Sequence, residues 1–353
     1  MRKFLIFLHI VSSLLMVASA FSSSVNPTDF WCPAFLGLLF PILFFIQIGW
    51  IVFWLFFKKK RTIFISIITL IICYKSIGDT IAFSAAASHA EQVSIMTWNV
   101  KNFDLYNWSN NEDSRDEMFA LIEEKSPDIL CLQEFYNEKN GDFQNIKDLK
   151  KQIGYDYAYF VETFCLDNGA RCWGLATFSK FPIEKEGFIT FETASRLNSC
   201  IYTDINIDDE IVRIYNTHLQ SIHLGQEDYE YIENAEPNLE SSRQIAIKLK
   251  NGFVNRAKQA IQVFNHRDIY EGRTMLCGDF NDTPVSFAYY LLSKNMQDAF
   301  CEKGLGMGST YAGKIPFLRI DYTLLDETFE VKNYKIYRKN YSDHYPTQTY
   351  FTL

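Results

Sequence analysis

The sequence has eight cysteines but no Cys-x-x-Cys pair and no cysteine–histidine spacing of the zinc-finger kind. This absence argues against a structural zinc site. Cys131 and Cys277 lie in apolar runs typical of buried strands, so we expect free buried thiols at both positions. Cys165 and Cys172 flank a polar loop, where they could form a disulfide in an oxidising compartment or remain free, and the sequence leaves both open.

The chain also lacks an excess of basic residues after position 90. The chain has 34 basic and 42 acidic residues, and the first 90 positions contain seven of the basic and two of the acidic ones. Residues 91–353 therefore contain 27 basic and 40 acidic residues, a net charge near −13. So acidic a surface repels polyanions at long range, which argues against tight, metal-free binding to nucleic acid. A nuclease is not excluded, because bound cations can reverse the local field.

Residues 35–57 contain no charge over 23 positions. A helix of this length, rising about 1.5 Å per residue, can cross a hydrocarbon core of roughly 30 Å. We therefore expect a membrane span over 35–57, in which neighbouring helices compensate for Pro41. The earlier apolar stretch, about 4–21, is either a first span or a signal peptide ending at Ala18-Ser19-Ala20.

The basic cluster at 58–61 predicts that the second span ends in the cytoplasm, because such clusters are retained there. A third apolar segment, about 62–83, is short and contains Lys75 and Asp79. If this segment crosses the bilayer, the rest of the chain lies outside the cytoplasm, and if it does not, the rest lies inside. We favour the extracytoplasmic side of a plasma or inner membrane.

These features divide the chain into three parts. We expect a transmembrane region over 1–83 that has the lipid bilayer as its partner, a small polar linker over 84–92, and a globular domain over 93–353. Nothing in the sequence indicates a protein partner.

Apolar runs in the globular part predict strands that alternate with helices. Some neighbouring strands are close enough for hairpins, so we expect a mixed sheet and an α/β (α+β) class with helices outside. Acid-rich residues 221–252 are interpreted as an excursion between core elements. The expected strands are 93–100, 128–132, 157–161, 175–178, 201–207, 211–216, 274–277, 320–325 and 329–337, and the expected helices are 113–125 and 253–264.

Polar side chains follow the apolar strands at six places. Strand ends are rigid, so such side chains can be held together as one unit. Each motif alone is weak evidence, and the argument rests on their joint occurrence in one order. They are Trp98-Asn99, Gln133-Glu134, Asn216-Thr217-His218-Leu219, Gly278-Asp279-Phe280-Asn281, Asp321-Tyr322 and Ser342-Asp343-His344-Tyr345-Pro346.

The chemistry of these residues indicates metal-assisted hydrolysis. Glu134 and Asp343 offer the hard oxygen ligands that Mg²⁺ or Mn²⁺ requires. A cation beside two imidazoles suits attack of water on a phosphate ester, in which negative charge builds on the phosphoryl oxygens. Asp279 could accept the proton of that water, and Asn281 could donate to a phosphoryl oxygen.

The ordered motif set resembles that of the endonuclease/exonuclease/phosphatase superfamily, the group that includes deoxyribonuclease I. The resemblance covers residues 93–353 and implies a four-layer sandwich of two mixed β-sheets flanked by helices, with the site at one end of the sheets. It implies metal binding by Glu134, assisted by Asn99 and Asp343.

The resemblance also implies catalytic roles for five residues. Asp279 and Asn281 would align water and phosphate. His344, oriented by Asp321, would contact the phosphate and transfer a proton. His218 would stabilise the transition state or serve the leaving group. There is one departure. Deoxyribonuclease-like members supply a carboxylate partner for the histidine at the position of His218 from a strand near 175–178, and Cys172-Trp173-Gly174 offers none.

From these patterns we expect a membrane-anchored, Mg²⁺- or Mn²⁺-dependent nuclease or phosphodiesterase. Two alternatives stay open: a phospholipid or sugar-phosphate phosphoesterase, and an inert binding module. The substrate would be a phosphoester of a nucleic acid or a phospholipid headgroup. Arg171 and Trp173 could contact its phosphate and its base or headgroup, although structural roles are the favoured interpretation.

Overall fold

The computed structural model describes residues 2–57, 60–84, 92–192, 197–222, 225, 227–228, 231, 239–313, 315 and 317–353. Two six-stranded sheets face each other, with strand orders β10-β12-β9-β8-β7-β6 and β13-β14-β2-β3-β5-β4. The central pair of each sheet is parallel, β8 with β9 and β2 with β3, and the other pairs are antiparallel. The predicted mixed α/β sandwich is therefore confirmed.

The strands extend beyond several of the predicted limits, and the sequence patterns did not predict β6 or β14. The bounds are β1 Ala82–Phe83, β2 Val93–Asn99, β3 Ile129–Glu138, β4 Tyr157–Leu166, β5 Arg171–Ser179, β6 Ile183–Ile189, β7 Ser199–Ile207, β8 Glu210–His218, β9 Arg273–Asp279, β10 Met296–Asp298, β11 Leu305–Gly306, β12 Asp321–Asp326, β13 Glu330–Ile336 and β14 Thr347–Thr352.

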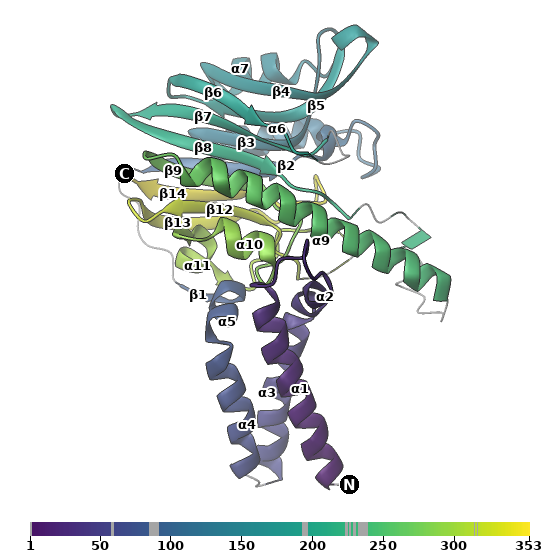
Figure 1. Cartoon of the computed structure of the whole chain (residues 1–353). Helices are drawn as coiled ribbons and strands as arrows, with labels where there is room; N and C mark the ends of the chain where they lie inside the picture. Colours follow the sequence, from purple (N-terminus) through teal and green to yellow (C-terminus); the bar gives the residue numbers. More distant parts are fainter. Residues whose placement is uncertain are drawn as a thin grey trace.

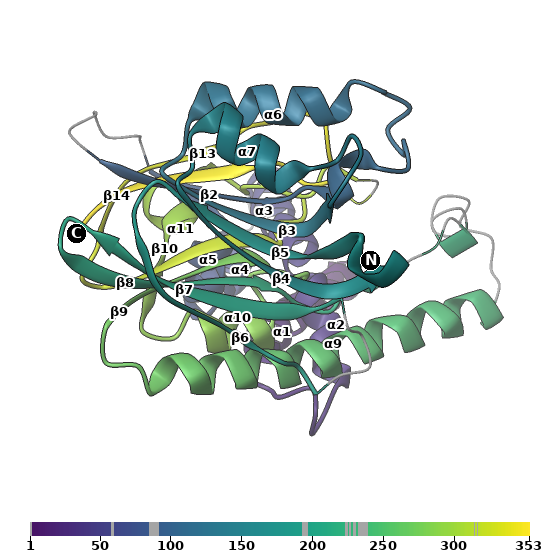
Figure 2. The same ribbon diagram turned by 90° about the horizontal axis from the view of Figure 1, so that it is seen from above.

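Helices cover the outer faces of both sheets, as Figure 2 shows, with α6 and α7 over one sheet and α9 over the other. The helix expected over 253–264 lies in the C-terminal half of the 30-residue α9, which begins at Leu239, so residues 239–252 of the acid-rich stretch 221–252 are helical too. The bounds are α1 Arg2–Ser22, α2 Cys32–Leu38, α3 Phe40–Phe56, α4 Lys60–Ile72, α5 Tyr74–Thr80, α6 Ser114–Lys125, α7 Asn145–Ile153, α9 Leu239–Asp268, α10 Phe287–Leu292 and α11 Ala299–Lys303.

The central strands are buried on both faces, which explains their nearly continuous apolar sequence. On one face, Ile95 and Ile129 pack with Met275 between the two sheets. On the other face, Met96 and Leu130 pack under α6 in a separate core. Burial of both faces fixes the strand register, because a slip of one residue would exchange the two sets of side chains.

The N-terminal helices form a bundle below the sandwich in Figure 1. α1 is long and apolar enough to cross a membrane, and the described residues contain up to three spans if the bent pairs α2–α3 and α4–α5 each count as one. The run 35–57 is not one straight helix, because the chain bends by 56° at Leu39. Pro41 lies in the first turn of α3, where its missing N–H costs no hydrogen bond.

Buried polar side chains join α1, α3 and α4. The indole N–H of Trp54 donates to Nδ1 of His9 at 3.0 Å, and Nε2 of His9 lies 2.7 Å from Oγ of Ser66, which donates to Gln47 at 3.0 Å. An indole is a donor only, so Nδ1 accepts, and the network is complete with a neutral imidazole. Satisfied polar groups of this kind hold helices together inside a bilayer.

The bundle packs directly on the globular domain. Val285 joins Met16 and Phe40 in an apolar cluster at the top of the bundle, and the Phe35 and Phe253 rings lie 5.2 Å apart. β1 pairs with β11, which adds a backbone connection. Most of the expected linker, residues 85–91, lies outside the described residues.

Candidate active site

Asn99, His218 and Asp279 are the last residues of β2, β8 and β9, and a bulge inside β3 brings Glu134 to the same place. Nδ2 of Asn99 donates to Oε1 of Glu134 and to Oδ2 of Asp279, each at 3.0 Å. Nε2 of His218 lies 3.7 Å from both carboxylates. Residues up to 180 positions apart in the sequence therefore meet at one point between the sheets.

Two backbone features create this meeting point. Glu134 has a φ of +47° at a bulge between Leu132 and Phe135, which turns its side chain out of the regular strand. A Cβ at Gly278 would lie 2.0 Å from the carbonyl oxygen of Thr217, so only glycine allows β8 and β9 to run this close. The close approach places His218 directly opposite Asp279 in the strand register.

Asp279 is fully buried and held from several directions. Its Oδ1 accepts from the backbone N–H of Asn281 at 2.8 Å, and its Oδ2 accepts from Nδ2 of Asn281 at 3.1 Å. Burial raises the pKa of Asp279 to about 6, although the two nearby histidines oppose this shift. Nδ2 of Asn281 also donates to the Leu219 carbonyl oxygen at 3.0 Å, so both its hydrogens are used in positioning this loop.

His344 carries the positive charge of the site. Burial alone would lower its pKa, but the carboxylates of Asp321 and Asp279 outweigh burial and raise the pKa well above the usual value. Nδ1 of His344 lies 3.0 Å from Oδ2 of Asp321, and Nε2 lies 3.7 Å from Oδ2 of Asp279. The two carboxylates therefore favour the protonated imidazole, and its Nε2 is directed toward Asp279.

An open cavity of about 230 Å³ adjoins these groups. Oδ2 of Asp343 at its edge pairs with Nζ of Lys101 at 3.0 Å. Burial and the neighbouring Asp343 raise the pKa of Glu134, although Asn99 donates a hydrogen bond to it. The cavity is lined by the predicted site residues Glu134, Asp279, Asn281, Asp343 and His344 and by Ser221, Ile222, Tyr311, Ile315, Leu318 and Ile320.

The donor set fits a hard divalent cation. Three carboxylates face one small space, and burial raises the pKa values of Glu134 and Asp279 despite the nearby positive groups. A bound cation would stabilise the ionised carboxylates further, and oxygen ligands favour Mg²⁺ or Mn²⁺. Asp279, Asp321 and His344 also lie close enough to hold a metal, but the bond from His344 to Asp321 uses one of the ring nitrogens.

A family model described as Endonuclease/Exonuclease/phosphatase family matches residues 96–344, more than half of the sequence. The chain belongs to this family. Its members are hydrolases, so the protein is an enzyme of this class. A second model, described as Domain of unknown function (DUF8431), matches residues 2–80. Among curated proteins, none matches this sequence.

Solved structures of the endonuclease/exonuclease/phosphatase family share the fold. A member from Beutenbergia cavernae has a TM-score of 0.54 and 16% identity over 75% of this chain and 72% of that chain. A mannosyl-6-phosphatase from Bacteroides thetaiotaomicron has a TM-score of 0.54 and 15% identity, and the match covers 74% of this chain and 100% of that chain. The human Nocturnin catalytic domain with bound sulfate has a TM-score of 0.52 and 18% identity, and the match covers 75% of this chain and 95% of that chain. These low identities establish the fold alone.

The structure brings together all eight residues that the sequence motifs selected. It also resolves the departure from deoxyribonuclease-like members of the family. β5 supplies no carboxylate to His218, and the acids near this histidine are Glu134 and Asp279 instead. Of these two acids, Glu134 is a predicted metal ligand and Asp279 is the predicted proton acceptor, and neither lies on the strand that the resemblance suggested.

Sequence reasoning missed three residues that shape the site. Lys101 pairs with Asp343, and Ser342 donates to the Asn99 carbonyl oxygen at 2.8 Å while accepting from the His344 N–H at 3.2 Å. The Trp98 indole donates to the His344 carbonyl oxygen at 2.9 Å across 246 positions. Ser342 and Trp98 belonged to quoted motifs, but only the fold shows that they fasten the histidine loop to β2.

A second cavity, of about 400 Å³, opens on the other side of Glu134 and His218. We call it the aromatic cavity, because Trp173, Phe164 and Tyr106 form much of its wall. Trp173 therefore lies where the sequence analysis placed a substrate contact. Arg171 instead pairs with Asp167 at 2.6 Å at the tip of the β4–β5 hairpin, and it is not part of the cavity lining.

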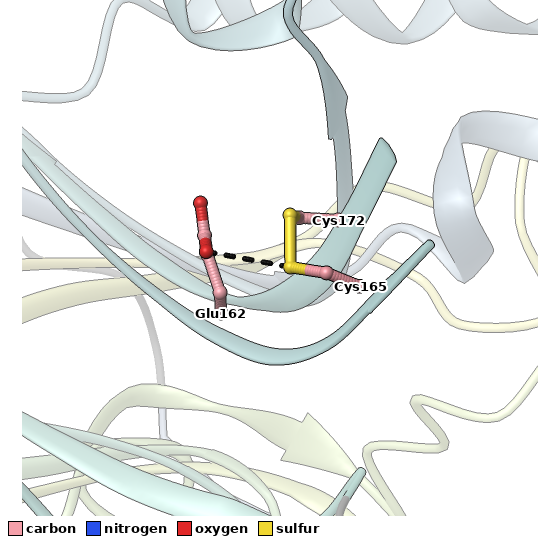
Figure 3. Close-up of side chains that lie close together, drawn as sticks. All are labelled: Glu162, Cys165 and Cys172. Carbon is pink, nitrogen blue, oxygen red and sulfur yellow. Dashed lines mark hydrogen bonds between the residues drawn. A yellow bond between two sulfur atoms is a disulfide. The ribbon is translucent and has the colours of Figure 1, made fainter. Parts of the chain in front are cut away.

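The tip of this hairpin is closed by a disulfide between Cys165 and Cys172, shown in Figure 3. The disulfide flanks Phe164 and Trp173, so it braces one wall of the aromatic cavity. Glu162 lies beside the two sulfur atoms, but both thiols are consumed and the group is not a metal site. Cys131 and Cys277 are free and buried, which confirms the prediction for these two thiols.

Proposed function

We propose that this family hydrolase is a membrane-anchored, divalent-metal-dependent phosphodiesterase that acts on nucleotide phosphoesters. One observation carries the proposal: three carboxylates and His344 surround an open cavity, next to a second cavity with aromatic walls. The first cavity suits a phosphoryl group beside a cation, and the second suits a planar base.

The site residues would have separate roles in the proposed reaction. Glu134 would hold the Mg²⁺ or Mn²⁺ ion with Asp343 and Asn99, and the ion would supply charge stabilisation to the phosphoryl oxygens. Asp279, with its pKa near 6, is mostly deprotonated at neutral pH and can accept a proton from the attacking water. The imidazolium of His344 donates a hydrogen bond to a phosphoryl oxygen, and His218 faces the developing charge from the opposite side.

The phospholipid alternative keeps a specific observation in its favour. Val285, only four residues after Asn281, packs into the top of the helical bundle, so the catalytic loop lies close to the proposed membrane. Hydrolysis of oligonucleotides, bis-p-nitrophenyl phosphate and phospholipid vesicles by the purified chain in Mg²⁺ separates the candidates. Cleavage of lipid without cleavage of oligonucleotide would refute the nucleotide proposal, and binding without any cleavage would identify an inert module.

Metal removal should abolish activity. EDTA is expected to stop hydrolysis of bis-p-nitrophenyl phosphate, and added Mg²⁺ or Mn²⁺ should restore it. Glu134→Gln should raise the metal concentration for half-maximal activity by about 10- to 100-fold, because a neutral amide is a much weaker ligand for a hard cation. Glu162→Gln, which changes a glutamate outside both site cavities, should leave the metal requirement unchanged. A metal-independent rate in EDTA would refute the metal assignment.

The oxidised Cys165–Cys172 pair supports an extracytoplasmic catalytic domain, because disulfides persist in oxidising compartments. Denatured protein from cells treated with a maleimide polymer should show six modified cysteines, and eight after reduction. Eight modified cysteines without reduction would place the domain in the reducing cytoplasm. The double variant Cys165→Ser/Cys172→Ser should lose about 2 kcal/mol of unfolding free energy, with a raised KM for substrates that fill the aromatic cavity.

A further inference from the structure

Two adjoining cavities lie where the helical bundle meets the catalytic domain. Their volumes are about 270 and 450 Å³, and they share no lining residue with the two active-site cavities. Figure 1 shows this junction below α10, between the upper ends of α1 and α5. We call the pair the junction cavity, defined by the residues common to both linings: Lys75, Asp79, Tyr289, Tyr290 and Ser293.

The junction cavity lies at the depth expected for lipid headgroups. α1 ends at Ser22 and α4 ends at Ile72, and the cavity is lined by Phe21, Ser23 and Ile72 beside these two ends. Phe21 is 60% exposed and Ile72 is 49% exposed, so apolar surface continues from the cavity along the bundle. A lipid with its headgroup in the cavity could therefore lay its acyl chains on exposed apolar side chains.

Lys75 and Asp79 line both cavities and carry opposite charges, and the larger cavity is also lined by Lys294, Asp298, Glu302 and Glu327. Among the described residues, neither Lys75 nor Asp79 forms an ion pair within 4.0 Å. The nearest ring to Nζ of Lys75 is that of Tyr290, with 5.6 Å to its centre. Charges so close to a low-dielectric region are costly without a counter-charge. A ligand that carries both signs would satisfy the two groups at once.

Two hydroxyl groups of the cavity lining, those of Ser23 and Ser24, can act as acceptors. Oγ of Ser23 donates to the Ala20 carbonyl oxygen at 3.1 Å, and Oγ of Ser24 donates to the Phe21 carbonyl oxygen at 2.8 Å. Their protons are therefore already used, and their lone pairs can accept from a ligand N–H. Together with the Asp79 carboxylate, these oxygens suit a primary ammonium group, and Lys75 suits a phosphate.

We propose that the junction cavity binds the headgroup of an ethanolamine phospholipid, with its phosphate at Lys75 and its ammonium at Asp79. The inference rests on the membrane anchoring in the proposed function. Choline headgroups have no N–H to donate, and glycerol headgroups bring a negative charge to Asp79 without a positive one. Because the cavity is lined by α1, α5 and α10, the bound lipid would brace the catalytic domain on its anchor.

The test uses the full chain in nanodiscs of phosphatidylcholine, alone or mixed with phosphatidylethanolamine or phosphatidylglycerol. Lipids that remain bound after detergent extraction are counted by mass spectrometry, and thermal unfolding is followed in the same samples. Wild type should retain about ten times more phosphatidylethanolamine than either of the other two lipids, because one charge-assisted hydrogen bond changes an affinity by about tenfold. Lys75→Gln and Asp79→Asn should each lose this preference, whereas Lys60→Gln, at the opposite end of α4, should keep it.

Each other outcome would overturn the assignment. Equal retention of all three lipids, or a preference for phosphatidylglycerol that survives Asp79→Asn, would show simple surface attraction. Saturating binding of free phosphoethanolamine to the detergent-solubilised chain with no lipid preference would identify a soluble ligand instead. Carbonate washing of wild-type membranes tests the anchoring separately: release of the chain would refute the anchor, while a resistant chain without lipid preference would refute only the cavity assignment.

Discussion

Asp279→Asn should lower kcat by about 10³-fold while leaving the chain folded, because the amide cannot accept the proton of the attacking water. The free energy of unfolding should stay within about 2 kcal/mol of wild type. The variant loses a hydrogen bond from Asn99 or Asn281. It also no longer buries a negative charge, and this gain offsets the loss, since burial raises the pKa of Asp279 to about 6. Hydrolysis of bis-p-nitrophenyl phosphate in saturating Mg²⁺ and chemical denaturation measure the two quantities.

Asp282→Asn is the matched control, three positions along the same loop. Asp282 is also buried, but it accepts from Nε of Arg256 at 2.8 Å and lines neither active-site cavity. Its replacement should cost about 3 kcal/mol of stability, because a buried guanidinium loses its counter-charge. The activity per folded molecule should change little. Catalytic losses of the same size in both variants would show that the loop conformation, rather than the Asp279 carboxylate, limits turnover.

His344→Ala should lower kcat/KM by about 10²- to 10⁴-fold, because it removes the imidazolium that stabilises charge on the phosphoryl oxygens. The companion Asp321→Asn keeps the ring and removes the carboxylate 3.0 Å from Nδ1. Asp321 helps to raise the His344 pKa, so its loss lowers that pKa and the ring loses its proton at a lower pH. The alkaline limb of the pH–rate profile should therefore move to lower pH in Asp321→Asn.

Profiles of kcat/KM from about pH 5 to about pH 10 test this prediction. An alkaline limb that stays in place in Asp321→Asn would show that another group controls it. Nearly wild-type turnover of His344→Ala would remove this histidine from the mechanism. Arg171→Ala is a suitable control, since Arg171 is exposed, pairs with Asp167 and lines neither site cavity.

The sequence predicted much of the site because its polar residues follow strands whose apolar patterns are local. Glu134 and Asp279 could be selected without a structure, and so could His344 with its partner Asp321. The sequence could not predict that His218 takes its acids from Glu134 and Asp279, because that pairing depends on the bulge at Glu134 and on the close approach at Gly278.

The same limit applied to the N-terminal part. The charge-free run 35–57 identified an apolar segment, but it did not predict the 56° bend at Leu39 or the packing of Phe35 of α2 against Phe253 of α9. The disulfide between Cys165 and Cys172 was left open because two cysteines seven positions apart can face each other only if a hairpin brings them into register. In the sequence, Lys75 and Asp79 were only two charges in a short apolar segment, and the fold showed that both line a cavity beside α10.

By itself, the sequence determined which chemical groups are available, in what order they occur, and where a lipid-compatible segment precedes a globular one. These properties arise from composition and from periodicities over a few residues. The tertiary structure alone decided which carboxylates lie beside His218, which cavity has aromatic walls, and how the N-terminal bundle meets the catalytic domain. Such contacts join residues from tens to about 240 positions apart. Packing of the two sheets and the bundle sets these contacts, whereas local propensity does not.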